Sequence, residues 1–394
     1  MDIHDFDDIR PFLPEELPAV YDRLLANPEF RYVLDFVGKD FPAGLSIPDV
    51  IRSCKTNLEF QIRVAYPLLK HLIATASHGL TFDFHALDDE RGRSHTFVSN
   101  HRDIVLDSAF LSVALHDAGL NTVEIAIGDN LLIRPWIKDI VRVNKSFIVQ
   151  RALTMRQMLL ASAKMSKYMH FCINRKNENI WIAQREGRAK DSNDLTQESV
   201  LKMMSMGGDL RDLNIVPLCI SYEYDPCDYL KAREYQLRRD LPYWKKAPGD
   251  DMESMNVGIK GFKGHIHYCC APCIDEWLQT VSQEQPRNKM FEQIAEHIDH
   301  EIHRNYLLYP QNYIALDMIQ NTKMYADHYT QDDFDNFEEY IASRLALIDI
   351  ENKDEAYLRR CLLTQYAYPT RNYLTATETT GRLKQFFSKF NFTK

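Results

Sequence analysis

The strongest constraint on the fold is an alternation of short apolar segments with segments of helical periodicity between residues 96 and 270. Two segments have clear helical periodicity, at residues 107–118 and 151–170. The strand candidates are residues 96–99, 122–127, 146–149, 180–183, 215–221 and 261–270. Strands that alternate with helices predict an α/β layer structure.

Helical patterns flank this region on both sides. Residues 57–76 form a long helix candidate that Pro67 should kink or divide. We expect a helical N-terminal region over residues 1–90, a core over 91–275 and a helical C-terminal extension over 276–394. A polar, charge-rich insertion occupies about residues 225–255 of the core. Apolar residues spaced three to four apart mark the helices of the extension: Met290, Phe291, Ile294, Ile298 and Ile302, then Phe334, Phe337, Tyr340, Ile341 and Leu345.

Charge is distributed unevenly along the chain. The 394 residues include 47 Lys and Arg against 56 Asp and Glu, which gives a formal net charge of −9. This balance argues against a nucleic-acid-binding protein, which needs a basic surface. Residues 134–190 nevertheless carry thirteen basic and only three acidic side chains. Such a block indicates a solvated face, an anion site or a membrane-facing surface.

The sequence also bears on localisation. The N-terminus is acidic and has no basic region followed by an apolar one, and no run of eighteen apolar residues occurs. Eight cysteines are too few for a disulfide scaffold and fit a reducing compartment. We expect a cytoplasmic protein, and we keep open a peripheral contact with the inner, anionic face of a membrane.

The sharpest local motif follows the first strand candidate. His101 comes directly after Asn100, with Asp103 and Asp107 two and six residues further on. Imidazole titrates near neutrality and can take a proton from an alcohol, while a carboxylate on its other nitrogen fixes the tautomer. Taken alone, the same residues also fit a capped helix start.

Two further motifs follow strand candidates. Arg151 lies just after residues 146–149, and Glu186-Gly187-Arg188 comes after residues 180–183. Arginine binds phosphate through two parallel hydrogen bonds, and glycine lets the backbone approach a ligand closely. Taken separately, these residues also fit a surface arginine and an exposed charged turn.

Together and in this order, the motifs resemble those of the phospholipid and glycerol acyltransferase family. That family has a His–Asp block, an aromatic-Ile-x-x-Arg strand end, a Glu-Gly-(x)-Arg turn and a Val-Pro strand. The resemblance covers roughly residues 96–222 and extends to a last strand and proline turn at 265–274. The matching residues are Asn100-His101-Arg102 with Asp107, Phe147-Ile148-Val149-Gln150-Arg151, Glu186-Gly187-Arg188 and Ile215-Val216-Pro217-Leu218.

The resemblance implies an O-acyltransferase with a glycerolipid acyltransferase-like α/β core. His101 would be the general base, oriented by Asp107, and Arg151 and Arg188 would hold the acceptor phosphate in a pocket shaped by Glu186 and Gly187. The donor would be acyl-CoA or acyl carrier protein. The acceptor would be a lysophospholipid or glycerol-phosphate compound, foremost 1-acyl-sn-glycerol 3-phosphate. No cofactor and no metal is implied.

This chain departs from the family pattern at two places. Five residues separate His101 from Asp107, where the family has four. Either the loop before the helix absorbs the extra residue, which we favour, or Asp103 orients the histidine. The turn is one residue short between Gly187 and Arg188, which leaves the role of Glu186 open.

Other functions stay open at this stage. One is acyl transfer to another lysolipid or to an amino-acid lipid, and another is a lipid-binding module without catalysis. A third is a metal or thiol-redox site built on His265, His267, Cys269, Cys270 and Cys273. A Ser-His-Asp hydrolase is not expected, because the Gly-x-Ser-x-Gly motif does not occur.

Methionines recur along residues 151–170. Met155, Met158, Leu159, Met165 and Met169 share one face of that helix candidate. Methionine is pliable enough to line an acyl-chain groove. A buried stripe under the sheet is the interpretation we favour.

Overall fold

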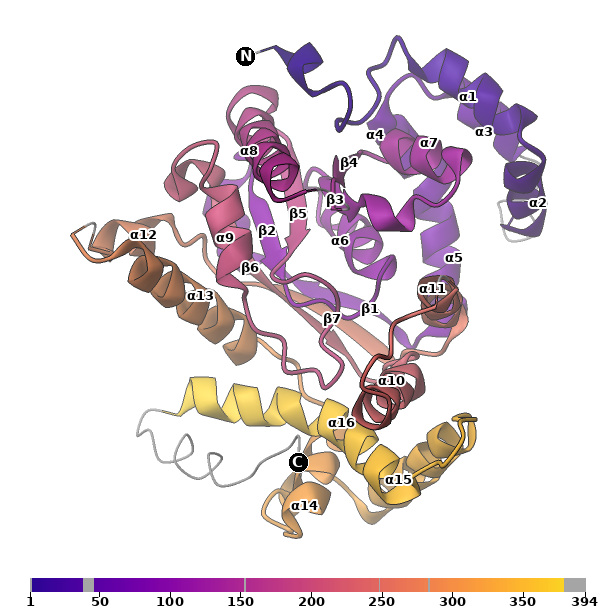
Figure 1. The fold of residues 1–394 in the computed structure, drawn as a ribbon, viewed down its shortest axis with the longest axis vertical. Coiled ribbons are helices and arrows are strands. Elements are labelled where there is room, and N and C mark those ends of the chain that lie inside the picture. The colour runs from indigo at the N-terminus through magenta and orange to yellow at the C-terminus, as the bar shows by residue number, and fades with distance from the viewer. Residues whose placement is uncertain (1, 38–45, 152–153, 248, 283, 379–394) are drawn as a thin grey trace.

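A seven-stranded sheet organises the molecule (Figure 1). The computed structural model describes residues 2–37, 46–151, 154–247, 249–282 and 284–378. The strand order is β1-β7-β6-β2-β5-β3-β4. Strands β6, β2, β5, β3 and β4 run parallel to one another. Strand β7 pairs antiparallel with β6, and β1 pairs parallel with β7. The predicted α/β class is confirmed.

The six strand candidates all form strands. Their bounds are Thr96–Ser99 for β2, Val123–Gly128 for β3, Ser146–Val149 for β4, Asn179–Ala183 for β5, Ile215–Tyr222 for β6 and His265–Cys270 for β7. The first strand, β1 (Gly79–Asp83), was not predicted. It is an edge strand without a buried residue, so its sequence lacks the apolar pattern of the central strands.

The helices between residues 17 and 60 pack beside the β3–β4 edge (Figure 1), whereas the last helix of this region packs along β1. Pro67 lies in the first turn of α5, directly after the π-helical turn Gln61–Ala65. The predicted interruption of residues 57–76 is therefore present, as a π-helical segment rather than a broken chain. The helices are α1 (Leu17–Ala26), α2 (Pro28–Val37), α3 (Ile47–Ser53), α4 (Asn57–Phe60) and α5 (Tyr66–Ala76).

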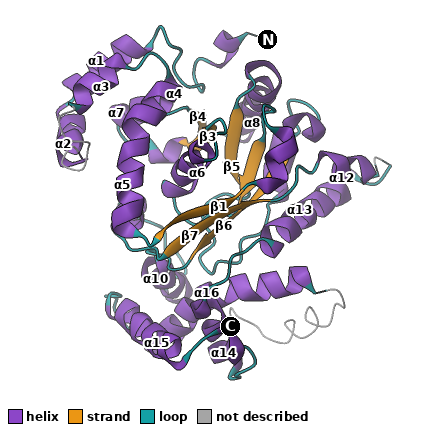
Figure 2. Cartoon of the chain, turned by 180° about the vertical axis from the view of Figure 1, so that it is seen from behind, coloured by secondary structure: helices purple, strands orange, loops and turns teal. Residues whose placement is uncertain are grey.

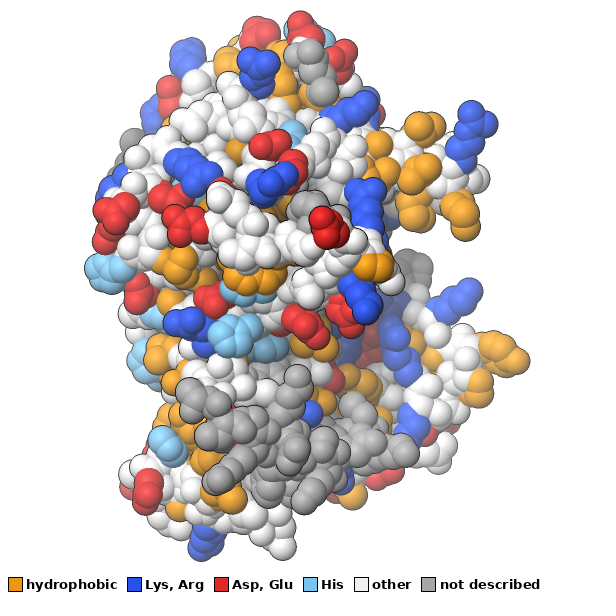
Figure 3. All heavy atoms as spheres, turned by 90° about the vertical axis from the view of Figure 1, so that its left-hand side faces the viewer, with side chains coloured by type: hydrophobic (Ala, Val, Ile, Leu, Met, Phe, Trp, Pro, Cys, Tyr) orange, Lys and Arg blue, Asp and Glu red, His pale blue; other side chains and the backbone are white. Residues whose placement is uncertain are grey.

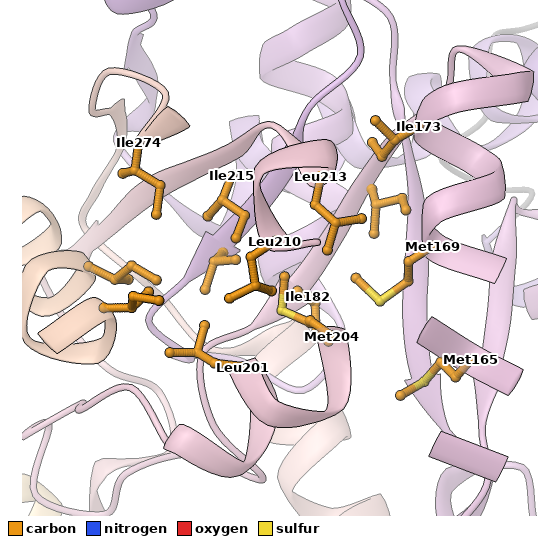
Figure 4. Packing of buried hydrophobic residues seen from close by; sticks show 14 of the residues in the cluster. Met165, Met169, Ile173, Ile182, Leu201, Met204, Leu210, Leu213, Ile215 and Ile274 are labelled. Carbon is orange, nitrogen blue, oxygen red and sulfur yellow. The ribbon is translucent and has the colours of Figure 1, made fainter. Parts of the chain in front are cut away.

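The two faces of the sheet bury different helices. Helix α6 (Leu106–Asp117) packs on one face. The opposite face carries α8 (Met155–Phe171), α9 (Glu198–Met204) and α13 (Arg287–Arg304), and Figure 4 shows part of this core around Met165, Met169 and Met204. Shorter helices complete these layers: α7 (Pro135–Val143) and α12 (Asp275–Thr280).

The C-terminal helices form a unit of their own beside the sheet (Figure 2). They are α14 (Pro310–Gln320), α15 (Gln331–Ala346) and α16 (Glu355–Thr377). The charged insertion joins this unit, because it folds into α10 (Asp228–Asp240) and α11 (Asp250–Lys260), and α10 packs against α16. Inside it, the buried Asp228 carboxylate accepts hydrogen bonds from Tyr366 and from Arg344, at 2.8 and 2.6 Å. In the described part of the chain, no helix is long and apolar enough to cross a membrane.

Candidate active site

His101 and Asp107 meet in the structure as a hydrogen-bonded pair. His101 follows the end of β2, and Asp107 lies in the first turn of α6. His101 Nδ1 is 2.8 Å from Asp107 Oδ2. The Asp107 side chain is 1% exposed and that of His101 is 13% exposed. With Nδ1 bound to the carboxylate, Nε2 is the nitrogen left for a substrate proton.

The extra residue of the His–Asp block is absorbed by the loop before α6. Asp107 also accepts hydrogen bonds from the backbone N–H groups of Arg102 (2.8 Å) and Asp103 (3.0 Å), so the loop wraps around its carboxylate. Asp103 instead accepts from the N–H groups of Val105 and Leu106, both at 2.8 Å. Asp103 thus caps the start of α6, whereas Asp107 contacts the imidazole.

Buried polar contacts fix the backbone around His101. The Asn100 amide donates to the Ile220 carbonyl and accepts from the Ile220 N–H, which ties the end of β2 to β6. The rings of Trp181 on β5 and His101 pack in a T-shaped arrangement, at 5.9 Å between centroids, and Trp181 donates its indole N–H to Ser99. The histidine is therefore held by three adjacent strands of the sheet.

The second and third motifs also come together. Arg151, after β4, forms an ion pair of 3.1 Å with Glu186, and its backbone N–H donates to Asp129. Gly187 has a φ of +68°, a conformation that favours glycine. Glu186 is mostly exposed, so it serves here as the partner of Arg151.

Arg188 is placed differently from Arg151. Its side chain is buried, and its guanidinium lies in the field of Asp103 and Asp225. One of its terminal nitrogens finds no hydrogen-bond partner among the described residues. A buried, unpaired guanidinium N–H carries a free-energy cost that an anionic ligand would remove.

A cavity of about 600 Å³ is lined by His101, Arg151 and the Glu186–Arg188 turn. His101 lies on its wall together with both arginines predicted from the motifs. The cavity is also lined by four cationic side chains that the motifs did not predict: Arg185, Lys190, Arg238 and Lys246. Arg185 and Lys190 flank the Glu-Gly-Arg turn and belong to the basic block. Arg238 and Lys246 come from the charged insertion, which has no local motif that would mark them.

Some of these cations are already paired. Glu234 forms ion pairs with Lys190 at 2.8 Å and with Arg238 at 2.7 Å. Burial, with the charge of Arg188 close by, lowers the pKa of Lys190 to about 8. Lys190 is therefore mostly protonated at pH 7, and a bound anion would favour that form further.

Asp194 is a further buried acid near this site. Neither of its carboxylate oxygens has a hydrogen-bond partner within the described residues. Burial raises its pKa, while the charges of Arg102, Lys231, Arg185 and His101 act in the opposite direction. Its sequence neighbours, Ser192 to Leu195, contain no pattern that would have indicated this position.

The methionine-rich face predicted for residues 151–170 is only partly buried. Met165 and Met169 belong to the buried core, whereas Met155, Met158 and Leu159 are exposed.

Burial raises the pKa of the Cys269 thiol to about 11 and that of Cys273 to about 12, which disfavours reactive thiolates. Within the described chain, neither His267 nor any cysteine belongs to a group of three potential metal ligands.

Comparison with known proteins identifies the class. Residues 85–221 match the family model Acyltransferase, a segment that contains His101, Asp107, Arg151 and the Glu186–Arg188 turn. The chain therefore carries a domain of the acyltransferase family. The predicted resemblance, and with it the prediction of an acyltransferase, is confirmed.

Among solved structures, the crystal structure of the 1-acyl-sn-glycerophosphate (LPA) acyltransferase PlsC from Thermotoga maritima is similar, with a TM-score of 0.36 and 11% identity. The match covers 72% of this chain and 94% of that one. Because this likeness is weak, the family assignment rests on the family model. No curated protein matches the chain in sequence.

Proposed function

We propose that the protein transfers a fatty acyl group from acyl-CoA or acyl carrier protein to the hydroxyl of a glycerol-phosphate-type acceptor, foremost 1-acyl-sn-glycerol 3-phosphate. One observation carries this proposal. His101, paired with Asp107, lines a cavity together with six cationic and four acidic side chains. A base that can activate a hydroxyl and a basic pocket for a phosphate thus share one site.

The reaction needs one proton carrier and no covalent acyl-enzyme. His101 Nε2 takes the proton of the acceptor hydroxyl while its oxygen attacks the thioester carbonyl. Asp107 stabilises the imidazolium that forms. The tetrahedral intermediate then collapses, the carbon–sulfur bond breaks, and the leaving thiolate takes the proton from His101. The products are the ester and the free thiol.

The acceptor phosphate would lie between Arg151 and Arg188. Arg188 supplies a buried guanidinium, one nitrogen of which has no partner among the described residues, and Arg151 supplies a more exposed one that pairs with Glu186. Glu186 would release Arg151 to the phosphate when substrate binds. In this proposal Glu186 controls whether Arg151 is available, and it does not itself bind the phosphate.

An acyl-transfer assay that crosses two donors with several acceptors tests the proposal. Release of free thiol is measured with acyl-CoA and acyl carrier protein as donors. The acceptors are 1-acyl-sn-glycerol 3-phosphate, glycerol 3-phosphate, a lysophosphatidylcholine and an acylated amino acid. We expect the highest kcat/KM with 1-acyl-sn-glycerol 3-phosphate. Faster turnover of an acceptor without a terminal phosphate would contradict the acceptor assignment, and no turnover with any would contradict catalysis.

Replacement of Arg151 tests the phosphate contact. Arg151→Ala should raise KM for the phosphate acceptor by roughly tenfold or more, because a hydrogen bond to a charged group contributes about 1.5–3 kcal/mol. We expect kcat to change little. Arg134→Ala is the matched control, since Arg134 forms a similar exposed ion pair with Glu29 at 2.6 Å but does not line the cavity. Equal KM changes in both variants would contradict the assignment.

Peripheral membrane contact is the second part of the proposal. Met155 (89% exposed) and Leu160 (64%) project from the start of α8, four and nine residues after Arg151. Tyr243 (95%) projects from the segment between the cavity residues Arg238 and Lys246. Figure 3 shows a hollow at the right-hand edge of the view, where basic side chains lie between projections that carry hydrophobic ones. Apolar tips beside a basic cavity suit an anionic lipid surface.

Vesicle sedimentation tests this contact. The protein should bind vesicles that contain an anionic lipid more strongly than neutral phosphatidylcholine vesicles, and added salt should weaken binding. The double variant M155S/L160S should lower the bound fraction several-fold without loss of folding, because both side chains are exposed. Leu347→Ser, at a 52% exposed leucine just after α15, is the control. Equal partition onto both vesicle types would refute the proposal.

A further inference from the structure

Three potential metal ligands meet at the edge of the sheet formed by β1, β7 and the end of β6. They are His78, Glu223 and His265, and their ligand atoms all lie within 4.8 Å of one another. Glu223 Oε2 is 2.7 Å from His265 Nδ1 and 3.8 Å from His78 Nδ1. None of the three lines the cavity around His101. The cluster is therefore separate from the proposed active site.

The backbone brings these residues together. β1 pairs with β7 in a register that sets Gly79 beside His265, so His78 lies next to the start of β7. His78 donates its N–H to the Gly264 carbonyl, and Glu223 donates its N–H to the His265 carbonyl. The cluster is thus fixed by strand pairing rather than by flexible side chains meeting by chance.

The carboxylate is held in place by contacts outside the cluster. Gln311 donates to Glu223 Oε1 at 3.0 Å, and the His265 N–H donates to Oε2 at 2.8 Å. Gly264 has a φ of +61°, and a Cβ at this position would lie 2.4 Å from Glu223 Oε2. The glycine therefore leaves the space that the carboxylate occupies. Metal-binding carboxylates are oriented in the same way, by outer hydrogen bonds.

We propose that His78, Glu223 and His265 form a binding site for a divalent transition metal, with Zn²⁺ as the ion of best fit. Two imidazoles and one carboxylate are a donor set that zinc prefers, and they leave a fourth position for water or a substrate. Ligand bonds of about 2.0–2.1 Å in a tetrahedron set donor atoms roughly 3.3 Å apart. The two Glu223 distances, 2.7 and 3.8 Å, lie on either side of that value.

The surroundings also fit a bound ion. The side chains of His78 and His265 are 54% and 55% exposed, which gives the ion a path from solvent, whereas Glu223 is 13% exposed. Aromatic rings of Phe262 and Tyr309 pack against the two histidines. Other His–carboxylate pairs, such as His85 with Asp88 at 3.1 Å, are not part of such a three-ligand group in the described chain. A site that joins three strands in this way should also stabilise the β1–β7 edge.

Zinc titration of the full chain, purified without a histidine tag, tests the site. Isothermal calorimetry should give one Zn²⁺ per chain, and excess Zn²⁺ should raise Tm. Co²⁺ in place of Zn²⁺ should give the visible absorption of a tetrahedral site. His78→Ala should weaken binding by more than about tenfold.

His85→Ala is the matched control, and it should leave zinc affinity unchanged. His265→Gln provides a second ligand variant if His78→Ala alters the circular dichroism spectrum measured in the presence of a chelator. The proposal is overturned if zinc does not bind saturably. It is also overturned if folded His78→Ala or His265→Gln binds as tightly as the wild-type chain. These measurements are independent of acyl transfer, so their outcome does not depend on the proposed function.

Discussion

Replacement of His101 by alanine should lower kcat/KM for acyl transfer by roughly 10²–10⁴, the range typical of a general base. The hydroxyl of the acceptor is a poor nucleophile unless its proton is removed as the carbon–oxygen bond forms. The structure offers His101 for this step because Asp107 holds Nδ1 at 2.8 Å and leaves Nε2 free to react. Thiol release from acyl-CoA in the presence of 1-acyl-sn-glycerol 3-phosphate measures the loss.

The folded state should tolerate this change. Without the imidazole, Asp107 still accepts two backbone hydrogen bonds, from Arg102 and Asp103. The midpoint of urea unfolding therefore should shift little. His85→Ala, which removes an exposed histidine that also pairs with a carboxylate, should keep full activity. Wild-type turnover by folded His101→Ala would show that the base lies elsewhere.

Asp107→Asn is expected to have the second largest effect, a fall in kcat of about 10²–10⁴ with a small change in KM. An asparagine amide facing the imidazole would donate to Nδ1 and so favour the tautomer that carries its proton on Nε2. That nitrogen could then no longer accept the proton of the hydroxyl. Stability should also fall, by about 1–3 kcal/mol, because Asp107 is buried and accepts backbone hydrogen bonds on both of its oxygens. Steady-state kinetics and urea unfolding separate the two effects.

Asp103→Asn distinguishes the two carboxylates of the motif. Asp103 accepts from the N–H groups of Val105 and Leu106 through a single oxygen, and an asparagine can keep both bonds. This variant should retain activity within about tenfold of the wild-type chain, since Asp103 makes no hydrogen bond to His101 among those of the described residues. The opposite result would assign the orienting role to Asp103: Asp103→Asn loses activity by about 10²–10⁴, and Asp107→Asn stays active.

Strand and motif positions followed from local sequence. The central strands are buried on both faces, so they must be continuous apolar runs, and such runs are visible without the fold. The motif residues lie directly after these strands, so the family resemblance could be drawn from their order. The edge strand β1 escaped prediction because a half-exposed strand carries no such pattern.

Contacts between distant residues could not be predicted in this way. The charged insertion is the clearest case, since its acidic and basic residues suggest an exposed segment. In the structure, Asp228 is buried against Arg344 and Tyr366, and Arg238 and Lys246 line the cavity around His101. Those pairings join residues about a hundred positions apart, and no local periodicity encodes them.

The sequence by itself determined the α/β class, the acyltransferase motifs and the basic block around them, because strand burial and turn chemistry are local properties. Only the tertiary structure decided that Asp107 rather than Asp103 contacts His101, because the choice depends on how a six-residue loop closes. It likewise decided that Arg188 is buried while Arg151 is exposed. The cluster of His78, Glu223 and His265 has the same origin, because strand pairing across β1, β7 and β6 brings together residues from three separate parts of the chain.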